Sequence, residues 1–318
     1  SNSNSKLFSN VKQKKTRLAP SPTGALHVGN LYAFLVNWAI ARQRNWSVSL
    51  RIEDIDGPRK KKGASEELIK VLAWAGIDWD GDITYQSATC TEMNTTLTKL
   101  KKLDAIYHCN LTRKEIEDSL SAPHVHPSET SPIYRPDNVR LHNATTPMGQ
   151  TNWRFVASTH PVSVHDEFLG TVSFTTANDF VLWSKDDMPS YQLAVVHDDH
   201  HQGITEVVRG NDLLQSAAWQ RQLCSALNWV EPRWYHIPLI LGIDGKRLAK
   251  RHGDSRIAYY VDNGVPIERI IGLIATWTNT RSTLSAMTTR EFLKEFDFTT
   301  LPKHDILFTA EANKWLHE

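Results

Sequence analysis

Two short stretches hold most of the residues that could do chemistry. In the first, residues 19–30 (APSPTGALHVGN), prolines and glycines precede a long apolar run. A chain that turns there and enters a helix near His27 gathers backbone N–H groups at a positive helix end, which binds anions. His27 can donate to a phosphate oxygen, and Gly29 lets another group approach closely. The stretch therefore predicts an anion site, although a turn of this composition before a helix is more often only a turn.

The second stretch, residues 245–253 (GKRLAKRHG), is a basic loop flanked by glycines. It places four cations in six positions, namely Lys246, Arg247, Lys250 and Arg251. A mobile cationic loop that faces an anion site can offset the charge that grows on departing phosphates when ATP is split. Taken alone, the loop is equally an exposed basic hairpin. Together, the two stretches favour nucleotide chemistry.

Strand and helix patterns alternate around the first stretch. Residues 16–20 and 48–56 have strand patterns, and residues 27–44 and 65–76 have helix patterns. Val48, Leu50 and Ile52 fall on one face of the second strand, so we expect that strand to be half-buried. The order strand, helix, strand, helix predicts an α/β fold with a Rossmann-like parallel sheet and crossover helices.

The pattern changes from about Ile106, where residues 121–138 are rich in proline, serine and histidine. Beyond this we expect β-rich pieces at 152–158 and 162–176, a buried strand and polar loop across 191–210, a helix at 213–229, a strand at 235–241, and helices at 266–277 and 288–296. Thr288 and Glu291 have the spacing of a capping box. The expected segments are a flexible leader (1–15), the first half of a catalytic domain (16–105), an inserted α+β subdomain of the acceptor-binding type (106–185), the second half of the catalytic domain (186–255) and a short helical C-terminal domain (256–318).

Composition limits the class of protein. The chain has 318 residues, of which 40% are hydrophobic and 22% charged, with a net charge of +1. These values are typical of a soluble globular protein, and no apolar run reaches the roughly 18 residues needed to cross a bilayer. The three cysteines, Cys90, Cys109 and Cys224, are too scattered for a disulfide framework. We therefore expect a cytoplasmic protein that does not bind membranes, and a monomer, because no heptad pattern indicates a partner helix.

The motifs resemble those of one enzyme family. Residues 20–30 resemble the HIGH motif of class I aminoacyl-tRNA synthetases, and RLAK at 247–250 resembles their KMSKS motif. The glutamyl branch is indicated by TRLAPSPTG, RIEDID, PSYQLAVVHDDHHQGITEVVRG and GKRLAKRHGD, which follow that branch's order between about Arg17 and about Asn279. The resemblance implies a class I synthetase fold and the activation of glutamate, with ATP as substrate, Mg²⁺ on its phosphates and no protein nucleophile.

The resemblance also indicates a branch. Only about 64 residues follow Asp254, so we expect this chain to lack the large helical anticodon-binding region that the resemblance to full glutamyl-tRNA synthetases would imply. The chain looks like the stand-alone members that attach glutamate to queuosine in the anticodon loop of tRNA(Asp), and Val195 stands where ordinary glutamyl enzymes commonly carry asparagine. Two alternatives stay open: an ordinary glutamyl core that acylates the tRNA 3′ end, and a silent paralogue that binds tRNA or an adenylate, which Ala249 favours. A nucleotidyltransferase acting on a small cofactor is disfavoured by RIEDID and ITEVVRG.

Site residues carry over by position. The resemblance implies a glutamate pocket made of Arg17, Ala19, Ser21, Glu53, Tyr191 and Arg209. The two arginines suit carboxylates, Glu53 suits the ammonium group, and the Ser21 and Tyr191 hydroxyls can hydrogen-bond. The implied ATP site is His27, Gly29, Asn30, Asp212 and Lys250, with His27 and Lys250 catalytic. Asn30 replaces the last histidine of HIGH, while Ala249 and Arg247 replace a serine and a lysine of KMSKS, so we expect a weaker loop.

Zinc is where the chain departs most from its relatives, many of which bind a structural zinc through three cysteines and a tyrosine. Cys109 and Tyr134 match, but Leu111 replaces the second cysteine and the last one is absent. One thiolate and one phenol do not make a tetrahedral site, so we expect no metal site unless His124 or His126 substitutes. We expect the HDDHH run at 197–201 to be a structural turn in which Asp198 and Asp199 hydrogen-bond.

Overall fold

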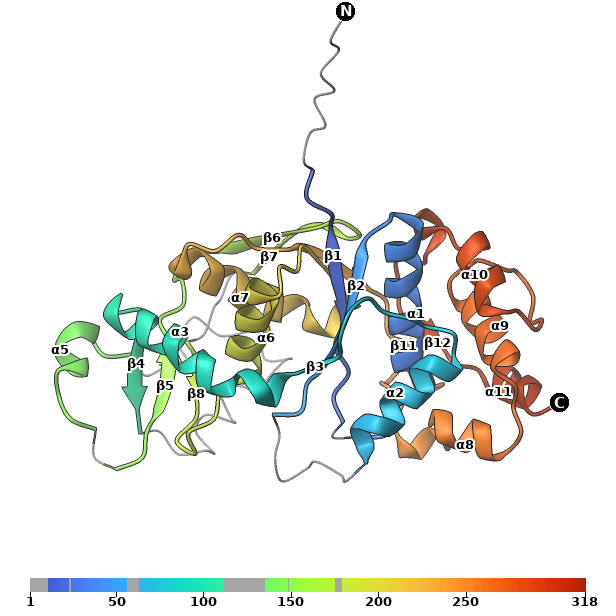
Figure 1. The fold of residues 1–318 in the computed structure, drawn as a ribbon, viewed down its shortest axis with the longest axis horizontal. Helices are drawn as coiled ribbons and strands as arrows, with labels where there is room; N and C mark the ends of the chain where they lie inside the picture. Colours follow the sequence, from blue (N-terminus) through green and yellow to red (C-terminus); the bar gives the residue numbers. More distant parts are fainter. Residues whose placement is uncertain (1–10, 23, 56–62, 111–134, 148, 175–178) are drawn as a thin grey trace, which may run out of the picture.

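The computed structural model describes residues 11–22, 24–55, 63–110, 135–147, 149–174 and 179–318 (Figure 1). Strands β1 (Lys15–Leu18), β2 (Ser47–Ile52) and β3 (Thr84–Tyr85) form a parallel sheet in the order β1-β2-β3. Helix α1 (Val28–Gln43) connects β1 to β2, and α2 (Ala64–Trp74) lies between β2 and β3. The predicted alternation and the α/β class are confirmed. No helix of the described ranges is long and apolar enough to span a membrane.

A second sheet continues the first. Strands β9 (Glu206–Gly210) and β10 (Arg233–Ile237) are parallel, and β9 lies against β1, where the Thr205 N–H donates to the Lys15 carbonyl at 2.9 Å. The hairpin of β6 (Val162–Asp166) and β7 (Gly170–Phe174) completes the order β7-β6-β10-β9. Helices α6 (Tyr191–His201) and α7 (Leu214–Leu227) precede and follow β9, so the helix expected at 213–229 is confirmed.

The expectation that β2 is half-buried is wrong. Val48, Leu50 and Ile52 are fully buried, but Arg51 on the opposite face is fully buried too. The reason is α6, whose Asp199 accepts a hydrogen bond from Arg51 Nη1 at 2.8 Å. Helices therefore cover both faces of this sheet, as they do in parallel sheets generally.

The buried strand expected at the start of 191–210, before a polar loop, is also wrong: residues 191–201 form α6, and the buried strand of this segment is β9 at its end. Ser190 caps this helix, with its Oγ accepting from the Leu193 N–H at 3.4 Å. Residues 193–199 are all buried, so the segment has no amphipathic period that could distinguish a helix from a strand. The expected turn at HDDHH is the end of this helix. The strand expected at 235–241 is split at Pro238 into β10 and β11 (Ile240–Leu241), which pairs with β12 (Ile306–Leu307).

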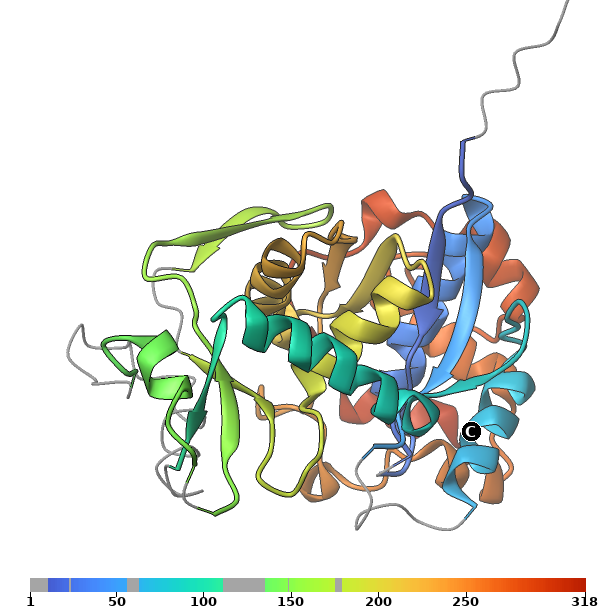
Figure 2. The same cartoon turned by 60° about the vertical axis from the view of Figure 1, so that its left-hand side comes forward.

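The insertion carries its own antiparallel sheet, made of β4 (Ile106–Cys109), β5 (Asn152–Phe155) and β8 (Phe180–Trp183). Figure 2 shows α3 (Cys90–Lys102) running from this unit toward the catalytic sheet, and α5 (Val139–Asn143) lies beside β4. The expected boundaries of the subdomain, 106 and 185, stay predictions. The β6–β7 hairpin lies within that range, yet β6 pairs with β10.

The C-terminal part is helical, as the sequence predicts (Figure 1). The Thr288 and Glu291 capping box is present, with the Glu291 N–H donating to Thr288 Oγ1 at 3.1 Å. The α-helices here are α8 (Ile257–Asp262), α9 (Ile267–Trp277), α10 (Thr289–Glu295) and α11 (Ala310–Leu316). A short 3-10 helix, η5 (Phe298–Thr300), follows α10, and the 3-10 helices before this part of the chain are η2 (Gln86–Thr89), η3 (Asn211–Leu213) and η4 (Lys250–His252).

Gly272 lies in the middle of α9, where the backbone at Ser285 packs too closely to leave room for a side chain. A Cβ at this position would lie 1.9 Å from the Ser285 carbonyl oxygen and 3.3 Å from the Trp315 ring. We expect Gly272→Ala to lower the free energy of unfolding by about 1–3 kcal/mol, the usual cost of overpacking. Urea denaturation measures this, with Gly24→Ala as the control because no atom lies within 4 Å of its added methyl. Equal stability of the two variants would show that α9 moves aside freely.

Candidate active site

The turn before α1 brings the residues of the first stretch together as predicted for a helix N-terminus. His27 is the N-cap residue, and its backbone N–H donates to Asn30 Oδ1 at 3.1 Å. Asn30 therefore closes the first helical turn. The His27 ring lies 3.0 Å from Ser255 Oγ through Nδ1, and burial lowers the pKa of this imidazole despite the opposing charge of Asp254. A neutral imidazole can donate a hydrogen bond without adding a full charge.

Backbone hydrogen bonds join the first stretch to residues 255–257, which come just after the second stretch. The Val28 N–H donates to the Ser255 carbonyl, and the Ile257 N–H donates to the Leu26 carbonyl, both at 2.9 Å. His27 and Arg256 form an antiparallel bridge. The segment that follows the basic loop is thus anchored on the turn before α1.

The basic loop between β11 and α8 is organised around one carboxylate. Asp244 accepts from Arg251 Nε at 3.1 Å and from His252 Nε2 at 2.6 Å. The His252 Nδ1 in turn accepts from the Ala249 N–H at 3.0 Å. The imidazole occupies the space beside Gly242, where a Cβ would lie 2.2 Å from the ring, so glycine is required for this packing.

Two implied ATP residues contact this loop directly. Asp212 pairs with Arg247 Nη2 at 3.0 Å, so one loop cation is held by the turn after β9. A Cβ on Gly29 would lie 3.6 Å from Ile240 and 3.7 Å from Leu248, which is ordinary contact. The protein alone therefore does not require glycine at position 29. Lys250 begins η4, and its side chain lies outside the described part of the chain.

Four of the residues implied for glutamate converge from separate elements. Arg17 lies on β1, Glu53 follows β2, Tyr191 begins α6 and Arg209 lies on β9. We call these four residues the charged cluster. They are close enough to influence one another's ionisation: burial raises the pKa of Glu53 against the pull of nearby arginines, and burial lowers the pKa of Arg209. A polar ligand with both signs of charge fits such a cluster.

The other two implied residues, Ala19 and Ser21, lie in the turn that leaves β1. The Glu53 N–H donates to the carbonyl of Pro20, between them, at 2.9 Å. This bond fixes the turn against the end of β2. Ser21 is exposed and Ala19 is partly buried.

Arg51 and Asp199 complete the site, and the sequence did not single out Arg51. Asp199 accepts from Arg17 Nε at 2.9 Å and from Arg51 Nη1 at 2.8 Å, and Arg51 Nη2 lies 3.5 Å from Glu53 Oε2. Burial opposes ionisation of Asp199, but the two arginines outweigh it and lower the pKa of this carboxyl. An arginine on the polar face of an alternating strand is normally expected to be exposed, so the strand pattern did not indicate that Arg51 is buried. The available signal was the pair Asp198 and Asp199, two acidic residues in an apolar segment that need cationic partners when they are buried.

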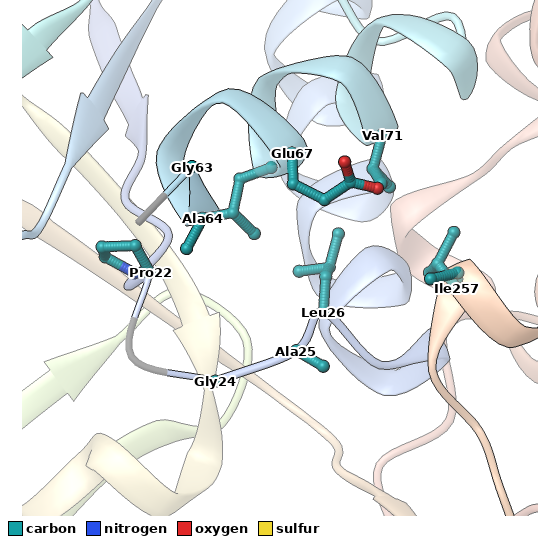
Figure 3. Close-up of a pocket in the computed structure, with 11 residues that line it drawn as sticks. Pro22, Gly24, Ala25, Leu26, Gly63, Ala64, Glu67, Val71 and Ile257 are labelled. Carbon is teal, nitrogen blue, oxygen red and sulfur yellow. The ribbon is translucent and has the colours of Figure 1, made fainter. Parts of the chain in front are cut away.

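A pocket of about 340 Å³ lies beside the turn before α1 (Figure 3). Pro22, Gly24 and Leu26 of this turn line it, together with Ala64 of α2 and Ile257 of α8. None of the residues implied for glutamate or ATP is among its described lining. Another pocket, of about 410 Å³, lies between the basic loop and the C-terminal helices, with Leu248 and Phe308 among its lining residues.

The described residues contain no group of three or more His, Cys, Asp or Glu side chains able to hold a metal. Cys109 is buried at the end of β4 as a free thiol. Leu111, His124, His126 and Tyr134 lie outside the described residues, so the expected loss of zinc stays a prediction. Asp198 and Asp199 do hydrogen-bond, the former accepting from Thr89 Oγ1 at 2.9 Å.

A parallel sheet whose strand ends carry the charged cluster, beside a helix N-terminus joined to a basic loop, defines the catalytic core of a class I synthetase. Comparison with known proteins agrees. Residues 13–315 match the tRNA synthetases class I (E and Q), catalytic domain, and the chain belongs to this family.

Individual relatives differ in length. The chain is 41% identical over 272 residues to a glutamyl-Q tRNA(Asp) synthetase of Rhodopirellula baltica, covering 80% of this chain and 82% of the relative. It is 39% identical to a glutamate–tRNA ligase of Cereibacter sphaeroides, covering 79% of this chain but only 54% of that relative. A solved glutamate tRNA ligase from Elizabethkingia meningosepticum, in complex with its amino acid, superposes with a TM-score of 0.79 at 26% identity, covering 96% of this chain and 69% of the other.

Proposed function

We propose that this chain activates glutamate with ATP and transfers the glutamyl group to queuosine in the anticodon loop of tRNA(Asp). The observation that carries the first step is the charged cluster, which sets two guanidinium groups and one carboxylate at the ends of neighbouring strands. Similarity to the relative named for glutamyl-Q tRNA(Asp) supports the acceptor. The division into catalytic halves 16–105 and 186–255, an insertion at 106–185 and a helical end at 256–318 belongs to the same proposal.

Glutamate carries two carboxylates and one ammonium group, and the cluster offers a partner for each. Arg209 and Arg17 bind the carboxylates, although Asp199 already takes the Nε and Nη2 donors of Arg17. Glu53 accepts from the ammonium group. Burial raises the pKa of Glu53 against the pull of Arg51 and Arg17, and the positive charge of a bound substrate ammonium would favour its ionised form. Tyr191, Ser21 and the backbone at Ala19 orient the amino acid.

ATP binds along the turn before α1, with His27, Gly29 and Asn30 beside the phosphates and Asp212 near the nucleotide. A glutamate α-carboxylate oxygen attacks the α-phosphorus in line, the bond from that phosphorus to the bridging oxygen breaks, and pyrophosphate leaves with the electron pair. Mg²⁺ carried on the phosphates would offset their charge. Lys250 stabilises the developing charge, and alignment of the reactants supplies much of the rate. A queuosine hydroxyl then attacks the acyl carbon, and AMP leaves.

Glutamate-dependent exchange of pyrophosphate into ATP, without tRNA, tests the first step. We expect exchange in the unmodified protein and a fall of at least about tenfold in Lys250→Ala, which corresponds to about 1.4 kcal/mol of transition-state stabilisation. Lys314→Ala, which removes an exposed lysine on α11, is the control. Exchange that appears only with tRNA would indicate an ordinary glutamyl-tRNA synthetase core, and no exchange in either condition would indicate a silent binding paralogue.

Transfer of labelled glutamate tests the acceptor. Three substrates separate the candidates: tRNA(Asp) with queuosine, the same tRNA with guanosine at that position, and queuosine-bearing tRNA(Asp) lacking its 3′-terminal adenosine. The proposal expects labelling of the first and third only. Labelling of the first and second, but not the third, would assign the activity to the tRNA 3′ end.

A further inference from the structure

We propose that His236 and Asp166 are positioning residues that hold the guanidinium group of Arg209 in the orientation that receives the substrate carboxylate. This inference rests on the proposed activation of glutamate. Neither residue belongs to the set implied for the pocket. Both are buried, His236 fully and Asp166 to within 1%.

The hydrogen bonds of Asp166 determine which nitrogen of His236 carries the proton. One carboxylate oxygen, Oδ1, accepts from the backbone N–H groups of Phe168 and Leu169, both at 2.8 Å. The other, Oδ2, accepts from the backbone N–H of His236 at 2.9 Å and lies 2.7 Å from its Nδ1. Because both oxygens of Asp166 accept hydrogen bonds, the ring nitrogen that faces Oδ2 must donate to it. The neutral ring of His236 therefore carries its proton on Nδ1.

The remaining ring nitrogen then faces Arg209. The Arg209 Nε–H group donates to His236 Nε2 at 3.1 Å. Nε2 can accept this hydrogen bond only if it carries no proton. A doubly protonated ring would place two donors and two positive charges against each other. Burial lowers the pKa of His236, against the opposing effect of Asp166, which agrees with a neutral ring.

The other sides of the Arg209 guanidinium are also fixed. Nη2 donates to the Leu213 carbonyl at 3.4 Å, and the Trp234 ring lies 5.1 Å from the guanidinium carbon. Nη1 is buried and has no hydrogen-bond partner among the described residues. An unpaired cationic donor in a buried site is costly unless a ligand accepts from it. The chain from Asp166 through His236 therefore leaves one oriented donor for a carboxylate.

Three variants test this assignment, with the KM for glutamate and the KM for ATP measured separately in each. In His236→Phe, which keeps a ring but no acceptor, we expect the KM for glutamate to rise about tenfold, the loss of roughly one hydrogen bond to a charged group, with the KM for ATP unchanged. In His236→Gln, whose Oε1 can accept near the position of Nε2, we expect glutamate KM to recover to within about threefold of the unmodified protein. Asp166→Asn, which favours the tautomer with the proton on Nε2, should resemble His236→Phe despite its unchanged shape.

Calorimetric titration with glutamate provides a readout that does not depend on turnover. If the unmodified protein binds glutamate but exchanges no pyrophosphate, the proposed function fails, while the affinities of His236→Phe and His236→Gln still test the positioning role. The inference is overturned if His236→Phe binds glutamate normally, if His236→Gln is as defective as His236→Phe, if the KM for ATP rises equally, or if the unmodified protein binds no glutamate.

Discussion

Replacing Arg209 by lysine is expected to lower kcat/KM for glutamate in pyrophosphate exchange by about 100-fold. Lysine keeps the positive charge but loses the planar group that His236 and Leu213 orient. A lysine ammonium group cannot both donate to His236, as Arg209 Nε does, and present a second donor to the substrate carboxylate, as we propose for Nη1. Two charge-assisted hydrogen bonds at about 1.5 kcal/mol each give about 3 kcal/mol, which is about 100-fold.

The matched control is Arg221→Lys. Arg221 lies on α7, the helix that follows β9 in the chain. Its side chain is 42% exposed, pairs with Glu231 at 3.4 Å and donates through Nη1 to the Ser163 carbonyl. These are surface contacts away from the charged cluster, so the change should leave kcat/KM within about twofold. Glutamate kinetics at saturating ATP give the comparison. Equal values for the two lysine variants would mean that position 209 supplies only charge.

Asp179→Ala is expected to destabilise the insertion by about 3–5 kcal/mol, the cost of removing one partner from a buried charged network. Asp179 is fully buried beside β8 and accepts from the Tyr107 hydroxyl at 2.7 Å, from the Ala157 N–H at 2.8 Å and from Arg135 Nε at 2.8 Å. Alanine removes the buried carboxylate that these three donors share.

Urea denaturation followed by tryptophan fluorescence measures this change, because Trp153 and Trp183 lie on the strands of the inserted sheet. Asp186→Ala is the control, since Asp186 is exposed in the turn after β8. We expect its unfolding curve to match that of the unmodified protein. A shift of less than about 1 kcal/mol in Asp179→Ala would show that water or neighbouring groups replace the lost acceptor.

Local patterns predicted the fold where they are unambiguous. The apolar periods of α2 and α9, the cap of α10 and the alternation around α1 all correspond to elements of the structure. The sequence was wrong at 191–201, where a completely buried helix has no polar face to reveal its period. The exposure of β2 was misjudged for another reason: Asp199, the partner that buries Arg51, is nearly 150 residues away in the chain.

The site was predictable to the extent that its residues resemble a family pattern. Arg17, Glu53, Tyr191 and Arg209 were named from the sequence, and the structure brings them together, while their roles stay proposals. His236 and Asp166 were not named. Each is an ordinary buried residue in its own strand, and only the pairing of β6 with β10 places them in contact.

The β6–β7 hairpin ties the segment expected to be an insertion, residues 106–185, to the charged cluster. A chimera that exchanged residues 106–185 for the equivalent segment of another synthetase would remove Asp166 and, with it, the group that sets the proton of His236. The graft would have to bring its own acidic residue at the end of the corresponding strand.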